Sequence, residues 1–133
     1  MAFVLDASIA ACWGLADEQH ADADLAFRRI RTEEAVVPTL WWFEVRNILV
    51  VNERRGRITL AESTAFLLYL SKLPVRADRL PEGESVLRMA RTHRLSVYDA
   101  AYLELAQRER LAIATLDADL RKAAPGEGVA LIS

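Results

Sequence analysis

The sequence has one cysteine, no apolar run long enough to cross a membrane, and almost no net charge. A lone cysteine, Cys12, excludes an intramolecular disulfide framework and fits a reducing, cytoplasmic compartment, where we expect it to be a small core residue. The apolar N-terminus lacks a basic region and contains Asp6, so we expect neither a signal peptide nor a membrane anchor. The formal net charge of −2 excludes a global basic field, so any nucleic-acid contact must come from local patches.

The 133 residues, 53% hydrophobic and 27% charged, predict one globular domain (residues 1–133) that buries about two-thirds of its unfolded surface. Strand patterns alternate with helix patterns, with no internal repeat, low-complexity tract or linker between them. This alternation predicts an α/β fold with a central, mainly parallel sheet covered by helices. Predicted strands cover 1–5, 34–37, 74–77, 111–115 and 129–132, and predicted helices cover 7–15, 22–31, 39–55, 59–73, 82–93, 96–109 and a short stretch ending at 124.

Two consecutive helices in the middle of the chain have recognisable ends. We expect Thr39 to cap the first helix and Gly56 to stop it. Thr59 and Glu62 have the spacing of a capping box at the start of the second. Two such helices in succession predict an αα-hairpin.

Two carboxylates follow predicted buried strands. Asp6 ends the apolar run at residues 1–5, and Asp117 comes just after the strand at 111–115. In an open parallel sheet, ligands bind outside the carboxyl ends of the strands. If both strands are parallel, the two side chains emerge at the same edge and lie in one cleft.

Two further carboxylates lie on predicted apolar helix faces. Glu44 falls within the arc of Leu40, Ile48 and Val51, and Asp99 lies on the stripe continued by Tyr102, Leu103 and Ala106. Several buried acids without matched cationic side chains are costly unless metal cations bind between them. Oxygen ligands favour magnesium or manganese over zinc. The histidines His20 and His93 lie in polar contexts and are expected at the surface.

Each acid also has a purely structural interpretation. Asp6 and Asp117 are placed to cap the helices that follow them, and Ser96 with Asp99 has the spacing of a capping box. Glu44 has Arg55, or an arginine elsewhere in the chain, as a candidate ion-pair partner. Convergence of the four acids on one site favours the metal interpretation.

The combined motifs resemble the PIN-domain nucleases, and within them the VapC-like toxins of type II toxin–antitoxin systems. The resemblance implies a three-layer α/β/α domain and a metal-dependent endoribonuclease that acts on RNA, with one or two Mg²⁺ or Mn²⁺ ions held by Asp6, Glu44, Asp99 and Asp117. It also implies supporting roles for Thr115 and Asn47, while Asp119 competes with Asp117 as the fourth ligand. The resemblance rests on residues 3–8, on Val37, Pro38, Glu44 and Asn47, on residues 95–102, and on residues 114–117.

The same resemblance implies a homodimer inhibited by a cognate, VapB-like antitoxin. Three aromatics in consecutive helix positions, residues 41–43, cannot all face one core, so at least one should reach a surface. It is either a single exposed ring beside a large core or an anchor for a homodimer or an antitoxin peptide. Arginine clusters at residues 54–57 and 28–31 are candidate contacts for RNA or antitoxin, or simply solvated faces.

Three alternative functions are also compatible with parts of the sequence. One is a PIN-type RNA-processing nuclease with no toxin role, and another is a non-catalytic module that binds RNA or an antitoxin. A haloacid-dehalogenase-type enzyme also begins with a strand and an Asp, but here Ser8 stands where the second catalytic Asp would be.

Overall fold

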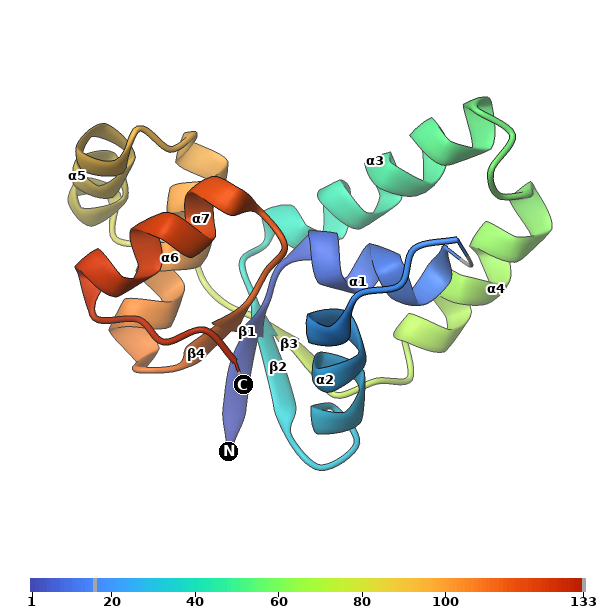
Figure 1. Cartoon of the computed structure of the whole chain (residues 1–133), viewed down its shortest axis with the longest axis horizontal. Helices are drawn as coiled ribbons and strands as arrows, with labels where there is room; N and C mark the ends of the chain where they lie inside the picture. Colours follow the sequence, from blue (N-terminus) through green and yellow to red (C-terminus); the bar gives the residue numbers. More distant parts are fainter. Residues whose placement is uncertain (16, 133) are drawn as a thin grey trace.

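A four-stranded parallel sheet forms the centre of the protein (Figure 1). The structure is a computed structural model that describes residues 1–15 and 17–132. The strand order β3-β2-β1-β4 places the first strand of the chain in the interior of the sheet. The predicted parallel α/β architecture is therefore confirmed. The strands are β1 (Ala2–Leu5), β2 (Glu34–Val37), β3 (Val75–Ala77) and β4 (Ala112–Ala114).

Helices cover both faces of this sheet, giving three α/β/α layers (Figure 1). One layer contains α1 (Ala7–Gly14), α2 (Ala21–Arg29), α3 (Leu40–Arg54) and α4 (Leu60–Leu70). The other contains α5 (Gly83–His93), α6 (Val97–Glu109) and α7 (Ala118–Ala123), followed by the 3₁₀ helix η1 (Ala124–Glu127). No helix in the described residues is long and apolar enough to cross a membrane.

The prediction of a fifth strand at residues 129–132 was wrong, because this segment does not form a full strand. Its contact with the sheet is an isolated parallel bridge between Leu131 and Ile113, with Ile113 donating to the Ala130 carbonyl at 2.9 Å. The Val129 N–H instead donates to the Ala124 carbonyl at 3.0 Å, closing the turn after η1. Because Val129 belongs to this turn, only the residues after it can pair with β4.

The ends of α3 and α4 follow the sequence signals except at Thr39. Thr59 and Glu62 form the predicted capping box, with hydrogen bonds of 3.1 and 3.0 Å. Gly56, with φ of 72°, takes the left-handed conformation that ends α3. The prediction that Thr39 caps α3 was wrong, because its backbone is already helical (φ −59°, ψ −30°) while a capping residue needs extended geometry. The helical turn begins one residue earlier, where Trp41 donates to the Pro38 carbonyl.

The predicted pair of consecutive helices is present as α3 and α4, joined at residues 55–59 (Figure 1). Both pack against α1 more than against each other. Since α1 starts directly from β1, this packing fixes the helix that carries Ser8 and Cys12 relative to the sheet.

Candidate active site

The carboxyl ends of β1 and β4 place Asp6 and Asp117 at one edge of the sheet. The two strands pair in parallel with Leu5 opposite Ala114, and the Asp6 N–H donates to the Ala114 carbonyl at 2.9 Å. Asp6 follows β1 directly, while Asp117 lies between β4 and α7. The shared edge expected from the sequence is therefore present.

Asp6 is buried, with 5% of its surface exposed, and two hydroxyls hold one of its oxygens. Oδ2 accepts hydrogen bonds from Ser8 Oγ at 2.8 Å and from Thr115 Oγ1 at 2.6 Å. Burial raises the pKa of Asp6, the two hydroxyls oppose this rise, and the charge of Asp117 adds to it. Asp6 precedes α1 but its side chain makes no capping hydrogen bond, so the capping interpretation was wrong for this residue.

Asp117 does cap a helix. Its Oδ2 accepts from the backbone N–H of Leu120 at 2.9 Å, in the first turn of α7. Its own N–H donates to Thr115 Oγ1 at 3.0 Å. The capping interpretation is therefore correct for Asp117, and the cap fixes the carboxylate in position at the strand edge that it shares with Asp6.

Asp99 lies half-buried in the first turn of α6. Ser96 caps this helix by accepting the Asp99 N–H at 3.0 Å, which is one half of the predicted capping box. Burial raises the pKa of the Asp99 carboxyl, and the charges of Asp117, Asp6 and Asp119 raise it further, against a lowering contribution from Ser96. Asp99 therefore shares an electrostatic environment with three other acids.

Glu44 reaches the same region from α3. Its Oε1 accepts a 2.6 Å hydrogen bond from the hydroxyl of Tyr102, a fully buried residue of α6. Burial raises the Glu44 pKa, Tyr102 opposes the rise, and the charges of Asp6 and Asp99 add to it. No ion pair within residues 1–15 and 17–132 includes Glu44, so the predicted alternative of a pair with Arg55 is not formed.

The four acids thus come from two strand ends and two helices, and the charges of neighbouring acids raise the pKa of Asp6, Glu44 and Asp99. Burying several negative charges close together is unfavourable, and a bound divalent cation can offset their repulsion. The donors are all oxygen, which suits Mg²⁺ or Mn²⁺. Among the described residues, no three of these carboxylates have oxygens that all lie within 4.8 Å of one another.

The supporting residues lie at different depths. Thr115 is 1% exposed and joins the backbone of Asp117 to the carboxylate of Asp6. Asp119 is exposed, yet its charge acts on Asp99. Asn47 is exposed on α3, one turn beyond Glu44.

Sequence reasoning assigned no role to two residues that hold the acids. Ser8 donates to Asp6 and its Oγ also accepts the Leu116 N–H at 3.1 Å, so it bridges the two strand ends. Tyr102 was expected only as part of the apolar stripe, but its hydroxyl binds Glu44 and accepts the Ala7 N–H at 3.4 Å. The available signal was that a buried tyrosine hydroxyl needs a polar partner.

Two surface predictions need correction. His93 is half-buried, with Nε2 2.6 Å from Glu127 Oε2, because η1 folds back against the end of α5. Arg57 is not a free member of a basic cluster: it bonds Asp17 at 2.8 Å and Glu18 at 3.1 Å. His20 is exposed as expected, and Cys12 is buried.

Residues 3–125 match the PIN domain family, and the chain belongs to that family. The fold is similar to PAE2754 from Pyrobaculum aerophilum, with a TM-score of 0.74 and 23% identity over 95% of this chain and 87% of that one. It is also similar to VapC20 from Mycobacterium tuberculosis, described as a sarcin–ricin loop cleaving toxin (TM-score 0.61, 15% identity, 91% and 94% covered). A toxin–antitoxin complex from Klebsiella pneumoniae gives a TM-score of 0.66 at 16% identity, with 98% and 96% covered. No curated protein sequence matches the chain significantly.

Proposed function

We propose that this PIN-domain protein is a Mg²⁺- or Mn²⁺-dependent endoribonuclease and the toxin of a type II toxin–antitoxin pair, acting in the cytoplasm. The observation that carries the proposal is the group of acids near the carboxyl edge of β1 and β4, where the charges of neighbouring acids raise the pKa of Asp6, Glu44 and Asp99. Asp6, Glu44, Asp99 and Asp117 are the proposed ligands for one or two ions. The toxin role draws on the similarity to VapC20 and to a toxin–antitoxin complex.

In such a site, some side chains would bind the metal ion and others would orient the ligands. A divalent ion held by the acids would supply an activated water nucleophile and offset the charge that develops on the phosphate. Ser8 and Thr115 both donate to Oδ2 of Asp6 and so fix the orientation of this carboxylate. Tyr102 orients Glu44 in the same way from α6. Hydrogen bonds of this kind orient the ligands of metal sites.

The test is cleavage of a mixed RNA pool by purified protein freed of any partner, with Mg²⁺, Mn²⁺ or EDTA. We expect cutting that needs metal and is lost in the folded variants Asp6→Asn and Asp99→Asn. Glu84→Gln, an exposed acid on α5, is the matched control and should cut normally. Folded wild-type protein that binds metal but cuts no RNA would support a binding module instead. A single-stranded DNA pool run in parallel tests the preference for RNA.

Arg54 and Arg55 are exposed at the end of α3 and are proposed RNA contacts. An α-helix rises 1.5 Å per residue, so Arg54 and Arg55 lie roughly 15 Å along α3 from Glu44. They would therefore contact the RNA outside the cleft. Each phosphate contact contributes about 0.7 to the slope of log K against log salt concentration for a single strand. Replacing both arginines should therefore reduce this slope by about 1.4. An unchanged slope would remove them from the RNA path.

A partner surface is proposed at the start of α3. Trp42 and Phe43 are 52% and 69% exposed, whereas Trp41 is buried, so the predicted surface aromatic is confirmed. Beside them lies a hollow of about 260 Å³ whose wall includes Trp41, and the Trp41 Nε1 has no hydrogen-bond partner within the described residues.

Size measurement in solution tests this surface. Trp42→Ser and Phe43→Ser should weaken self-association or binding of the antitoxin, because exposed aromatics are frequent interface anchors. Leu80→Ser, which is exposed elsewhere, is the control. If the variants assemble as the wild type does, the partner binds another face.

A further inference from the structure

A second group of metal-ligand side chains lies on α1 and on the segment that leads into α2. The Cys12 Sγ, a Glu18 carboxylate oxygen and a His20 ring nitrogen all lie within 4.8 Å of one another. Cys12 belongs to α1, and His20 directly precedes α2. These donors differ in kind from the four acids, because they include sulfur and nitrogen.

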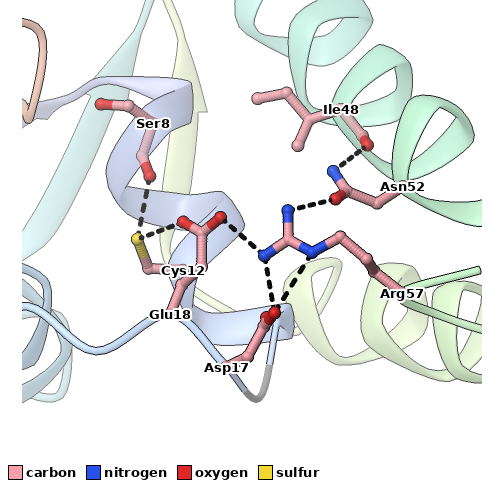
Figure 2. Close-up of polar contacts among 7 residues, drawn as sticks. All are labelled: Ser8, Cys12, Asp17, Glu18, Ile48, Asn52 and Arg57. Carbon is pink, nitrogen blue, oxygen red and sulfur yellow. Dashed lines mark hydrogen bonds and ion pairs between the residues drawn. The ribbon is translucent and has the colours of Figure 1, made fainter. Parts of the chain in front are cut away.

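Cys12 and Glu18 already have the spacing of two ligands. Figure 2 shows the Cys12 Sγ between the Ser8 carbonyl, at 3.3 Å, and Glu18 Oε2, at 3.7 Å. Sulfur and oxygen ligands of a tetrahedral zinc ion, at their usual bond lengths of about 2.3 and about 2.1 Å, lie about 3.6 Å apart. The Sγ–Oε2 distance of this pair is therefore close to that between two ligands of one zinc ion.

Glu18 is held in place from its other side. Its Oε1 accepts from Arg57 Nη2 at 3.1 Å, and the same guanidinium bonds Asp17 at 2.8 Å and Asn52 Oδ1 at 2.7 Å (Figure 2). Asn52 is itself buried in α3 and donates to the Ile48 carbonyl at 2.8 Å. Hydrogen-bonded support of this kind is usual for carboxylates that bind metals.

The pair is reachable from solvent. A hollow of about 280 Å³ is lined by Cys12, Glu18 and Phe27, together with Trp13 and Asp24. His20 is exposed, and its side chain makes no capping hydrogen bond at the start of α2. An ion can therefore enter, and a water molecule has room to complete its coordination.

We propose that Cys12, Glu18 and His20 form a zinc-class site, with water as a fourth ligand. A thiolate and an imidazole select Zn²⁺ over Mg²⁺, and three protein ligands plus water are a common zinc arrangement. Binding releases the thiol proton to solvent as the S–Zn bond forms. The ion ties α1 to the segment before α2, and the proposal is independent of the nuclease function.

The test is titration of metal-free protein with Co²⁺, followed by displacement with Zn²⁺. Because the chain has one cysteine, sulfur-to-cobalt charge-transfer absorption reports this site and not the acidic cleft. We expect one equivalent of Co²⁺ to produce that absorption and Zn²⁺ to abolish it. Cys12→Ser should lose the absorption, and Glu18→Gln and His20→Asn should each weaken binding at least roughly tenfold.

Two controls separate this site from its neighbours. Asp17→Asn removes the other carboxylate bound to Arg57, and Asp6→Asn removes an acid of the cleft; both should keep the charge-transfer absorption. Zn²⁺ should also slow the modification of Cys12 by a thiol reagent in the wild type, but not in the His20→Asn variant. This measurement does not require a substitution of the cysteine. Folded wild-type protein without thiolate–cobalt absorption, or Glu18→Gln and His20→Asn variants that bind like the wild type, would overturn the proposal.

Discussion

The hydroxyl of Thr115 donates a 2.6 Å hydrogen bond to Oδ2 of Asp6, across the paired ends of β4 and β1. The same hydroxyl oxygen accepts the backbone N–H of Asp117 at 3.0 Å. Thr115 thus links the acids at the two strand ends directly, beside the bridge that Ser8 makes from Asp6 to the Leu116 backbone. Because the residue is 1% exposed, water cannot replace either bond when the hydroxyl is removed.

Thr115→Val should therefore lower the free energy of unfolding by about 1–3 kcal/mol, the cost of leaving buried polar groups unsatisfied. It should also weaken Mn²⁺ binding to the acids by roughly 10–100-fold, as loss of a ligand's hydrogen-bond partner usually does. Urea unfolding and Mn²⁺ titration measure the two effects. Thr115→Ser retains the hydroxyl and should restore both; if Val and Ser behave alike, the hydroxyl has no such role.

Tyr102→Phe should release Glu44 without opening the core, because the two side chains differ only in the hydroxyl. The lost bond, 2.6 Å long and made to a carboxylate, should lower stability by about 1.5–3 kcal/mol at neutral pH. Mn²⁺ affinity should fall as well. Tyr98→Phe, on the same helix but 66% exposed, is the matched control, and equal effects of the two substitutions would contradict the assignment.

Thr59→Ala should remove the cap of α4, which is the hydrogen bond that the Thr59 hydroxyl accepts from the Glu62 N–H. We expect a loss of about 1 kcal/mol, measured as a lower urea midpoint with an unchanged slope. Thr64→Ala, at an exposed position within the same helix, removes a hydroxyl that bonds the Leu60 carbonyl and should cost less. Equal losses would mean that the cap contributes little.

Glu127 should make the protein sensitive to acid. Arg88, together with His93 and Gln107, lowers the pKa of Glu127 from 4.5 to about 2. In that interval the unfolded chain binds a proton that the folded chain does not, so this contribution to stability is present above pH 4.5 and is lost as the pH falls toward 2.

Glu127→Gln should therefore destabilise the protein by about 1–3 kcal/mol at pH 7, a range that allows for screening at the exposed Arg88. The difference from wild type should shrink steadily in urea melts at pH 4.5, 4 and 3. A difference that does not change with pH would show that the carboxylate charge is not the source. Glu84→Gln, which is exposed on α5, serves as the control.

The alternation of apolar and amphipathic segments determined the layered fold from the sequence alone. Burial on both faces turns a parallel strand into a continuous apolar run, as in Phe3–Leu5, so the residue pattern was enough to place β1 and β4 and the acids that follow them. The PIN resemblance rested on these positions together with Glu44 and residues 95–102, and it is confirmed by the family match over residues 3–125. Thr39 failed as a cap because the turn at Pro38 had already made its backbone helical.

Other features were decided only by tertiary structure, because they join residues far apart in the chain. The local sequence showed that Asp117 was suited to cap a helix and that Glu44 faced inward, but not that Thr115 would reach Asp6 or Tyr102 would reach Glu44. The same holds for Arg57, whose basic neighbours suggested a free cluster until the fold brought Asp17 and Glu18 against it. Periodicity determines which face of an element is buried, whereas packing of the elements determines which partner each buried polar group meets.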